Sequence, residues 1–314
     1  MWAIRLTLTV VVALCTALQS SGNAVAHSSP SSDQSASTER QSSCQMREAL
    51  KRLPAALGEA SGAAASRRHR GIVWTHNDSA EPVLFAVDVS DKVVGRVRLT
   101  GADVVDWESV TVAACPQGSC LFVGDIGDNG AKRDHVTVYR VREPALDAQS
   151  TESVTRLVAR YPDGPRDAEA LVVLPPGHIF IVTKGDKSPV DVYRFPEQSQ
   201  SRTPAVLERV RTLRDGKVKA AKRVTGADAD PDGRWVVVRT GASLSAYDAN
   251  DFVAGGEPMW QMDLSSLGEP QGEGVALDSD GLITLIGERA DGPSGTIARL
   301  QCAFGGRPRG TSGQ

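Results

Sequence analysis

The chain has 314 residues, with 35 Lys and Arg against 38 Asp and Glu, so its formal net charge is −3 at pH 7. A slightly acidic chain without a long basic stripe lacks the electrostatic surface that nucleic acids or anionic lipids attract. We therefore expect no nucleic-acid partner.

The N-terminal residues have the pattern of a secretory signal peptide. Arg5 precedes an apolar stretch over residues 6–18, and Ala24-Val25-Ala26 has the small-x-small pattern of a cleavage site. The stretch is shorter than the run of apolar residues that a membrane-spanning helix needs. We expect a signal peptide over residues 1–26, a secreted protein and no membrane span. Residues 27–43, which are rich in Ser, and residues 305–314 are expected to be a disordered leader and a disordered tail.

Between these ends, short apolar runs open five times with acidic or glycine residues. The five openings begin at Glu59, Asp106, Asp167, Gly226 and Gly272. Their spacing of roughly 45 to 60 residues is the period of repeated four-stranded sheets rather than of helical solenoids. The sequence therefore predicts an all-β fold, a single five-bladed β-propeller over residues 44–304. A sixth, degenerate blade in the N-terminal segment is the alternative.

Turns that contain Pro or Asp-Gly between β-branched runs mark the hairpins within each blade. In the first two blades we expect strands over residues 61–65, 71–75, 83–87 and 94–99, then 106–114, 121–124, 136–141 and 154–160. In the next two we expect 168–174, 178–183, 190–195 and 206–213, then 227–229, 235–239, 243–247 and 259–264. The fifth blade has three, over residues 275–277, 282–286 and 296–300.

The missing strand and the cysteines predict how the ring closes. After signal cleavage four cysteines remain, an even number that favours disulfides in an exported chain. Cys115 and Cys120 bracket a hairpin turn, which leaves Cys44 and Cys302 as the second pair. If residues 44–50 supply the outer strand of the fifth blade, these two cysteines meet and the two termini close the ring. Residues 46–57 also have near-helical apolar spacing, so a capping helix is the alternative.

Strand directions alternate within a blade, so the start of the first strand and the end of the second lie on one face of the ring. Both positions are rich in acids, whereas the loops of the opposite face are plain Pro, Gly and Asp turns. Acids that converge on one channel repel each other unless a cation balances them, and oxygen ligands suit Ca²⁺. The expected metal ligands are Glu108, Glu169, Asp228 and Glu273. In the alternative, each acid caps its own loop or pairs with a basic residue such as Lys184 or Arg239.

His76 is the expected general base, because it ends a strand with Asp78 near enough to orient it. Asp106 and Glu108 complete the expected catalytic set. Trp107 beside these acids either stacks on a sugar ring or fills a blade interface. The expected ligand-binding residues on this face are Trp107, Asp125, Asp128, Asn129, Lys184, Arg239 and Glu288.

Several of these segments resemble known propellers. Glu59 to Gly62, Ile72 to Asp78, Asp106-Trp-Glu108 and Asp125 to Asn129 resemble uncharacterised secreted bacterial propeller proteins. More distantly, acids at inner-strand starts look like those of gluconolactonase and arylesterase propellers and of esterase-like phytase domains. The lactonase resemblance implies a Ca²⁺ held by an acid, asparagines and an aspartate. This chain has acids where those asparagines are expected.

Two functional hypotheses follow from the sequence. In the first, the chain is a secreted hydrolase of esters, lactones or phosphate esters that uses Ca²⁺ to polarise the substrate. In the second, the same face binds a small molecule or saccharide without catalysis. In both, the protein is expected to be a monomer.

Overall fold

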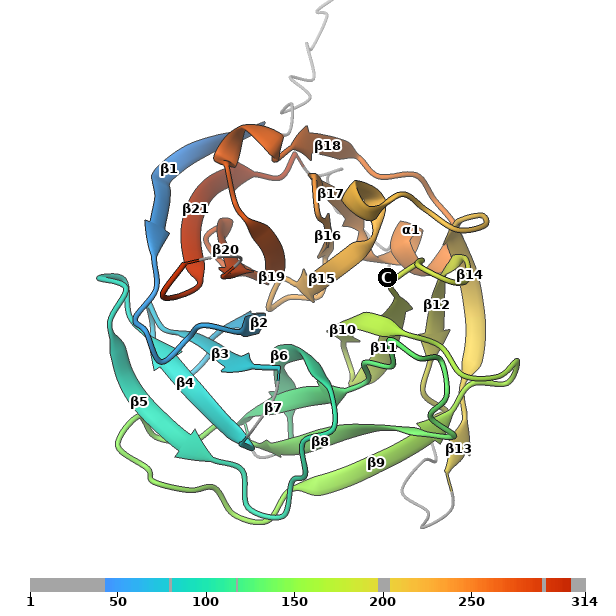
Figure 1. Cartoon of the computed structure of the whole chain (residues 1–314), viewed down its shortest axis with the longest axis horizontal. Helices are drawn as coiled ribbons and strands as arrows, with labels where there is room; N and C mark the ends of the chain where they lie inside the picture. The colour runs from blue at the N-terminus through green and yellow to red at the C-terminus, as the bar shows by residue number, and fades with distance from the viewer. Residues whose placement is uncertain (1–42, 79–80, 117, 197–203, 290–291, 306–314) are drawn as a thin grey trace, which may run out of the picture. The chain divides into compact units, whose positions relative to one another are not determined.

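Five antiparallel sheets make up the computed structural model, which describes residues 43–78, 81–116, 118–196, 204–289 and 292–305. The predicted signal peptide, almost all of the leader and most of the tail lie outside these residues. The innermost strands of the sheets contact one another in ring order, so the sheets are the five blades of a propeller (Figure 1). The prediction of an all-β propeller with five blades is confirmed, and a sixth blade is wrong.

Blades 1 and 2 follow each other directly in the chain. Blade 1 contains β2 (Ala60–Ala65), β3 (Val73–Asn77), β4 (Val83–Val87) and β5 (Val93–Arg98). Blade 2 contains β6 (Trp107–Cys115), β7 (Gly118–Asp125), β8 (Val136–Arg142) and β9 (Thr155–Arg160), with the two-residue β13 (Ala205–Val206) added in parallel to its edge.

Blades 3 and 4 carry the few helical turns of the described residues. Blade 3 contains β10 (Ala168–Leu174), β11 (His178–Thr183), β12 (Val190–Arg194) and β14 (Glu208–Arg214), and the 3₁₀ turn η1 (Ala220–Lys222) leads out of it. Blade 4 contains β15 (Val224–Ala229), β16 (Trp235–Thr240), β17 (Ser243–Asp248) and β18 (Trp260–Asp263). The helix α1 (Ala249–Ala254) lies between β17 and β18, and the 3₁₀ turn η2 (Ser265–Leu267) follows β18. None of the helices among the described residues is long and apolar enough to cross a membrane.

Blade 5 is built from both ends of the described chain. It contains β19 (Gln271–Leu277), β20 (Leu282–Glu288) and β21 (Thr296–Ala303), and β1 (Ser43–Arg52) pairs antiparallel with β21 (Figure 1, blue beside red). Cys44 faces Cys302 in this pair, and the two form a disulfide; Cys115 and Cys120 form the other. Closing a loop of 258 residues in the unfolded chain gives this bond a gain of roughly 5 kcal/mol in the chain-entropy model.

The alternative helix over residues 46–57 is wrong, because the exposed edge of β21 offers backbone hydrogen bonds that a strand can satisfy and a helix cannot. Met46, which would belong to the apolar face of that helix, is 44% exposed.

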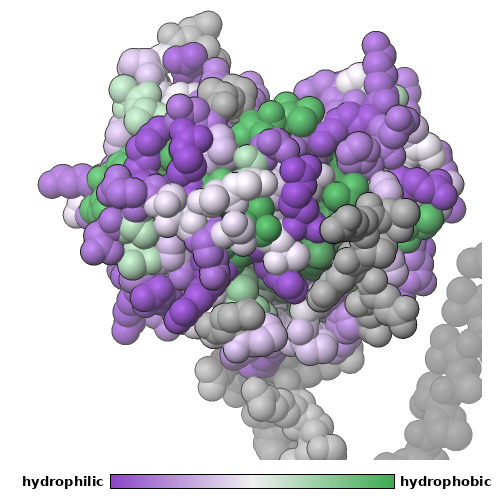
Figure 2. All heavy atoms as spheres, turned by 90° about the horizontal axis from the view of Figure 1, so that it is seen from below, coloured by the Kyte–Doolittle hydropathy of each residue, from purple (hydrophilic) through white to green (hydrophobic). Residues whose placement is uncertain are grey.

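Apolar side chains fill the spaces between neighbouring blades. Each of the five buried clusters takes its members from two adjacent blades; one of them contains Trp74 of blade 1 together with Val110 and Tyr139 of blade 2. Both faces of each blade are therefore buried. On the outer surface in Figure 2, apolar side chains occupy separate small areas between hydrophilic ones.

All five inner strands carry a β-bulge at the same level. The register between the first and second strand of each blade shifts at a single residue in three blades, at Glu108, Glu169 and Thr225. In the other two blades it shifts over a pair, Ser61-Gly62 and Glu273-Gly274. A bulge re-aims a side chain that would otherwise follow the pleat. The predicted inner strand 227–229 of blade 4 began too late, because β15 starts at Val224 and places Thr225, rather than Asp228, at the bulge.

The residue after each bulge residue is small: Gly62, Ser109, Ala170, Gly226 and Gly274. These positions lie where neighbouring blades touch. A Cβ on Gly62 would lie 2.5 Å from the Val110 nitrogen, and one on Gly226 would lie 2.8 Å from the Glu273 carbonyl oxygen. In blade 2, Ser109 Oγ accepts a hydrogen bond of 3.0 Å from the Leu171 amide of blade 3.

Replacing Gly62 by Ala should therefore destabilise the ring, because the new Cβ would press on the backbone of blade 2. We expect a loss of about 1–3 kcal/mol in the free energy of unfolding, the usual cost of overpacking. Denaturant unfolding measures it. The matched control is Gly130→Ala, whose Cβ would meet only the Lys132 side chain at 3.4 Å. Equal stability of the two variants would contradict this account of ring closure.

Candidate functional site

A polar cavity of about 200 Å³ lies at the end of the ring where the inner strands begin. Its walls come from blades 1, 2, 3 and 5, and they consist almost entirely of carboxyl, amide, amine and hydroxyl groups. The lining residues are Ser61, Asp78, Asp106, Glu108, Asn129, Glu169, Lys184, Gln271, Glu273 and Glu288. Six of these ten are acids and one is basic, so the cavity has an excess of negative charge if all the acids ionise.

The bulges bring three glutamates together in the cavity. Glu108, Glu169 and Glu273 occupy the bulges of β6, β10 and β19, and Ser61 occupies that of β2. Ser61 Oγ donates a hydrogen bond of 3.3 Å to Glu108 Oε2. Gly127 keeps room on the other side of Glu108, because a Cβ there would lie 2.5 Å from Glu108 Oε1 and 2.6 Å from Asp106 Oδ2.

Lys184 supplies the positive charge of the cavity. It follows β11, and its Nζ lies 2.5 Å from Glu169 Oε1, 3.5 Å from Asp167 Oδ2 and 3.3 Å from Asn129 Oδ1. Burial by itself would lower the pKa of Lys184, but the charge of Glu169 and the hydrogen bond to it outweigh burial and raise the pKa. The amine therefore keeps its proton at neutral pH.

The glutamates of the cavity, Glu169 included, hold protons more tightly than ordinary carboxyls do, chiefly because burial raises their pKa values. Burial raises the pKa of Glu108 well above its usual range, and the charges of Glu169 and Asp106 add to the rise. Burial, followed by the charges of Glu273 and Asp78, raises the pKa of Glu288 to about 7. Gln271 links Glu288 to Glu273, because its Nε2 donates 2.7 Å to Glu273 Oε1 and also to Glu288 Oε2. Part of the cluster is therefore protonated at neutral pH.

The cavity has oxygen donors of the kind that Ca²⁺ takes, but they are not arranged as a metal site. Among the residues that the structure describes, no group of three or more His, Cys, Asp or Glu is arranged to hold a metal ion. Lys184 already neutralises Glu169, and a Ca²⁺ ion at the same carboxylate would have to displace or repel this ammonium group. The presence of Ca²⁺ stays a prediction of the sequence.

Eight of the predicted site residues meet in this cavity: Asp78, Asp106, Glu108, Asn129, Glu169, Lys184, Glu273 and Glu288. Sequence reasoning missed Ser61 and Gln271. Ser61 could have been found by aligning the five bulges, because it precedes Gly62 as Glu273 precedes Gly274.

The structure places His76 away from the cavity. Its side chain is fully buried between blades 1 and 2, where its Nδ1 lies 3.1 Å from the Asn77 carbonyl oxygen and its ring meets Trp107 edge-on at 5.6 Å. Burial lowers the pKa of His76 to about 4, so the ring is neutral at pH 7. Trp107 is also fully buried, and its Nε1 donates 2.9 Å to the Asp103 carbonyl oxygen. Of the two interpretations of Trp107, the blade interface agrees with this position.

Asp125 and Asp128 shape the loop behind the cavity. Asp125 forms an ion pair of 2.8 Å with Arg133 and accepts the Asp106 amide at 3.1 Å. Asp128 Oδ2 accepts the amides of Lys132 and Arg133 at 2.6 and 2.8 Å, which is the pattern of a side chain holding its own turn. Both carboxylates are engaged within the protein.

Two further predicted residues are buried elsewhere. Arg239 is fully buried between blades 4 and 5, where it donates to the carbonyl oxygens of Gly274 and Ile286 and pairs with Glu269. Asp228 lies farther along β15 and accepts from Thr111 Oγ1 at 2.8 Å and from the Leu277 amide at 2.9 Å. It therefore ties blades 2, 4 and 5 together and does not join the three glutamates.

Comparison with known proteins finds only distant structural similarity. No protein family model matches the chain, and no curated protein does. Among solved structures, the chain is similar to the PQQ-bound aldose sugar dehydrogenase of Streptomyces coelicolor (11% identity, 83% of this chain and 98% of that one, TM-score 0.49). It is also similar to a gluconolactonase of Xanthomonas campestris (14% identity, 77% and 72%, TM-score 0.42). The expected distant similarity to gluconolactonase-type propellers is thus found.

The raised pKa values of these acids make the stability of the fold depend on pH. Groups whose pKa is raised by folding, such as Glu108, Glu288 and Asp228, stabilise the fold below their unfolded pKa and lose that contribution as pH rises through the folded pKa. We expect the Tm to rise by at least about 2 °C between about pH 8 and about pH 6.5. Below that, His76 opposes the trend, because its folded pKa is lowered.

Calorimetry over this pH range measures the effect. Glu108→Gln should reduce the slope, because its neutral amide has no proton to gain. A Tm that falls steadily from about pH 8 to about pH 6.5 would contradict the assignment of raised pKa values to this cluster.

Proposed function

We propose that the acid-rich cavity hydrolyses small, uncharged ester or lactone bonds by general acid–base catalysis. The observation that supports this most is the gathering of Glu108 and Glu288, two carboxyls with raised pKa values, in one open cavity. Strongly perturbed acids in a cleft favour a functional site over a purely structural ion network.

Glu108 acts as the acid in this proposal. Burial raises its pKa well above the usual range of a carboxyl, which favours the protonated form that an acid needs. It donates this proton to the leaving oxygen as the carbon–oxygen bond breaks. Ser61, which bonds to Glu108 Oε2, and the gap at Gly127 position the carboxyl and leave it room to reach a substrate.

Glu288 acts as the base. A pKa of about 7 is close to the optimum for proton transfer at neutral pH. In its ionised form it takes a proton from the water that attacks the carbonyl carbon. Gln271 orients the Glu288 carboxylate through its amide, and Lys184 supplies positive potential that favours the negative oxygen of the intermediate.

The charges of the cavity narrow the substrate class. The acids outnumber the single lysine, which disfavours phosphate esters and other anions. Hydrolysis of a neutral ester or lactone creates a carboxylate, which the same acids repel and so help to release. The amide and carboxyl groups of the wall suit a hydroxyl-rich substrate about the size of one sugar ring.

The cellular setting is part of the proposal. The signal-peptide pattern at residues 1–26 and the two disulfides favour export into an oxidising compartment. Calcium is not required for the steps above, because Lys184 provides the charge that the ion would supply.

A screen of purified protein against neutral esters and lactones of small polyols tests the proposal. Glu108→Gln and Glu288→Gln should each lower kcat/KM by about 10²- to 10⁴-fold, the usual contribution of a positioned acid or base. In the native protein, activity should rise with pH through about 7, the pKa of Glu288. Glu288→Gln should remove this rise.

The matched control is Glu208→Gln, the same substitution outside the cavity lining, where Glu208 pairs with Arg194 at 2.6 Å. It should leave kcat/KM unchanged, and so should removal of Ca²⁺ with a chelator. Loss of activity with the chelator would restore the calcium hypothesis and contradict ours. Binding of a polyol without any hydrolysis would favour the ligand-binding alternative.

A further inference from the structure

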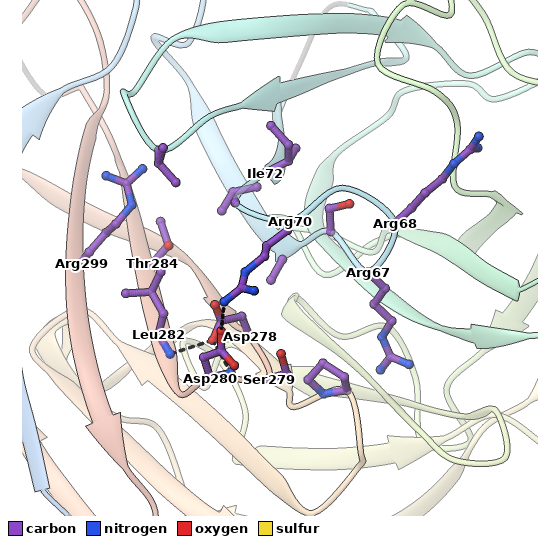
Figure 3. A pocket seen from close by; sticks show the side chains of 16 residues that line it. Arg67, Arg68, Arg70, Ile72, Asp278, Ser279, Asp280, Leu282, Thr284 and Arg299 are labelled. Carbon is purple, nitrogen blue, oxygen red and sulfur yellow. Dashed lines mark hydrogen bonds and ion pairs between the residues drawn. The ribbon is translucent and has the colours of Figure 1, made fainter.

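A second cavity opens at the opposite end of the ring. It has a volume of about 410 Å³ and is lined mainly by the turn between β2 and β3 and the turn between β19 and β20 (Figure 3). A neighbouring cavity of about 560 Å³ shares residues 278–280 with it. The sequence predicts only plain Pro, Gly and Asp turns on this face, and the structure places two cavities beside these turns.

The β2–β3 turn is held rigidly against blade 2. The Ser66 amide donates 2.9 Å to the Ile72 carbonyl oxygen, and Ser66 Oγ bonds to the Glu143 carboxylate. Arg68 Nη1 donates 3.1 Å to the Glu143 carbonyl oxygen, and His69 Nε2 lies 3.0 Å from the Pro144 carbonyl oxygen. Because the turn is fixed on both sides, the backbone of Arg67 is fixed as well.

Arg67 differs from the other arginines of this cavity. Its guanidinium forms no hydrogen bond or ion pair with any residue in the described part of the chain. By contrast, Arg70 pairs with Asp280 at 3.0 Å, and Arg299 pairs with Asp91 at 2.6 Å and with Glu48 at 2.7 Å. In Figure 3, Arg67 and Arg70 extend toward the side where Asp278, Ser279 and Asp280 lie, and Arg68 turns away.

The unpaired guanidinium is partly withdrawn from water. Burial lowers the pKa of Arg67, and more distant acids, of which Asp228 is the strongest, only partly oppose this. A charge in such a place costs stability unless a ligand pairs with it. The protein therefore keeps an arginine that its own residues leave without a bonded partner.

Two acids at this end of the ring, Asp278 and Asp230, form no ion pair with Arg67, and each uses one carboxylate oxygen in its own turn. Asp278 Oδ1 accepts the amides of Asp280 and Leu282, both at 2.8 Å. Asp230 Oδ1 accepts the amides of Arg234 and Trp235 at 2.6 and 2.7 Å. Each carboxylate thereby stabilises a hairpin of its own blade.

We propose that this cavity binds a small molecule through a carboxylate or phosphate group that pairs with the Arg67 guanidinium. The planar guanidinium presents parallel N–H donors that match both kinds of oxyanion. The volume falls in the range of small-molecule sites. Arg70, whose side chain is 92% exposed, can turn from Asp280 to the same anion, because an exposed ion pair contributes little.

The test compares thermal unfolding of the full chain in chloride, in inorganic phosphate and in succinate at equal ionic strength. Phosphate or succinate should raise the Tm of the native protein above its value in chloride. Titration calorimetry should show at least about a tenfold loss of affinity in Arg67→Gln, which removes the bidentate charged pair. The salt that acts identifies the group: phosphate alone for a phosphorylated ligand, succinate alone for a carboxylate.

The matched control is Arg96→Gln, which removes one positive charge from an exposed pair with Glu81 that does not line this cavity. Arg96→Gln should show the same rise of the Tm in phosphate or succinate as the native protein. The proposal is overturned if neither salt raises the Tm above its value in chloride. It is also overturned if Arg67→Gln shows the same rise as the native protein.

A second readout separates binding from a structural role. In chloride alone, Arg67→Gln should leave the Tm unchanged or raise it, because no bond is lost. A clear fall of the Tm in chloride would make Arg67 a structural residue and would also overturn the proposal.

Discussion

The contact of five inner strands around a narrow axis is the constraint on which the rest of this structure depends. Neighbouring blades approach so closely that Gly62 and Gly226 have no room for a Cβ, and Ser109 instead bonds to the next blade. A bulge at the level of these small residues lets the preceding side chain leave the pleat. The same geometry that closes the ring therefore turns Glu108, Glu169 and Glu273 toward one place.

The chemistry of the cavity follows from this convergence. Three buried glutamates from three blades cannot all be ionised near one lysine without a large cost, so part of their charge is removed by protons. Lys184 forms an ion pair with Glu169, and burial raises the pKa of Glu108 well above its usual range. At the other end of the ring the group without a bonded partner among the described residues is a cation, Arg67, rather than an acid.

Much of the fold could be predicted because its signals are local. Hairpin turns and apolar runs gave the blade order, and the positions of Cys44 and Cys302 indicated closure by β1 and β21. Blade 4 was misaligned because its bulge residue is Thr225, while the acid nearby, Asp228, lies three residues farther along the strand. The direction of His76 could not be predicted, because both faces of a blade are buried and the apolar pattern does not distinguish them. Whether a buried acid faces a lysine, as Glu169 does, depends on contacts between blades.

The most direct measurement of the central claim is the protonation state of the cavity glutamates, read from the carboxyl stretching bands in the infrared spectrum. The account predicts a protonated carboxyl band in the native protein at neutral pH, which weakens in Glu108→Gln and remains unchanged in Glu208→Gln. A native spectrum in which every carboxyl is ionised at neutral pH would contradict it.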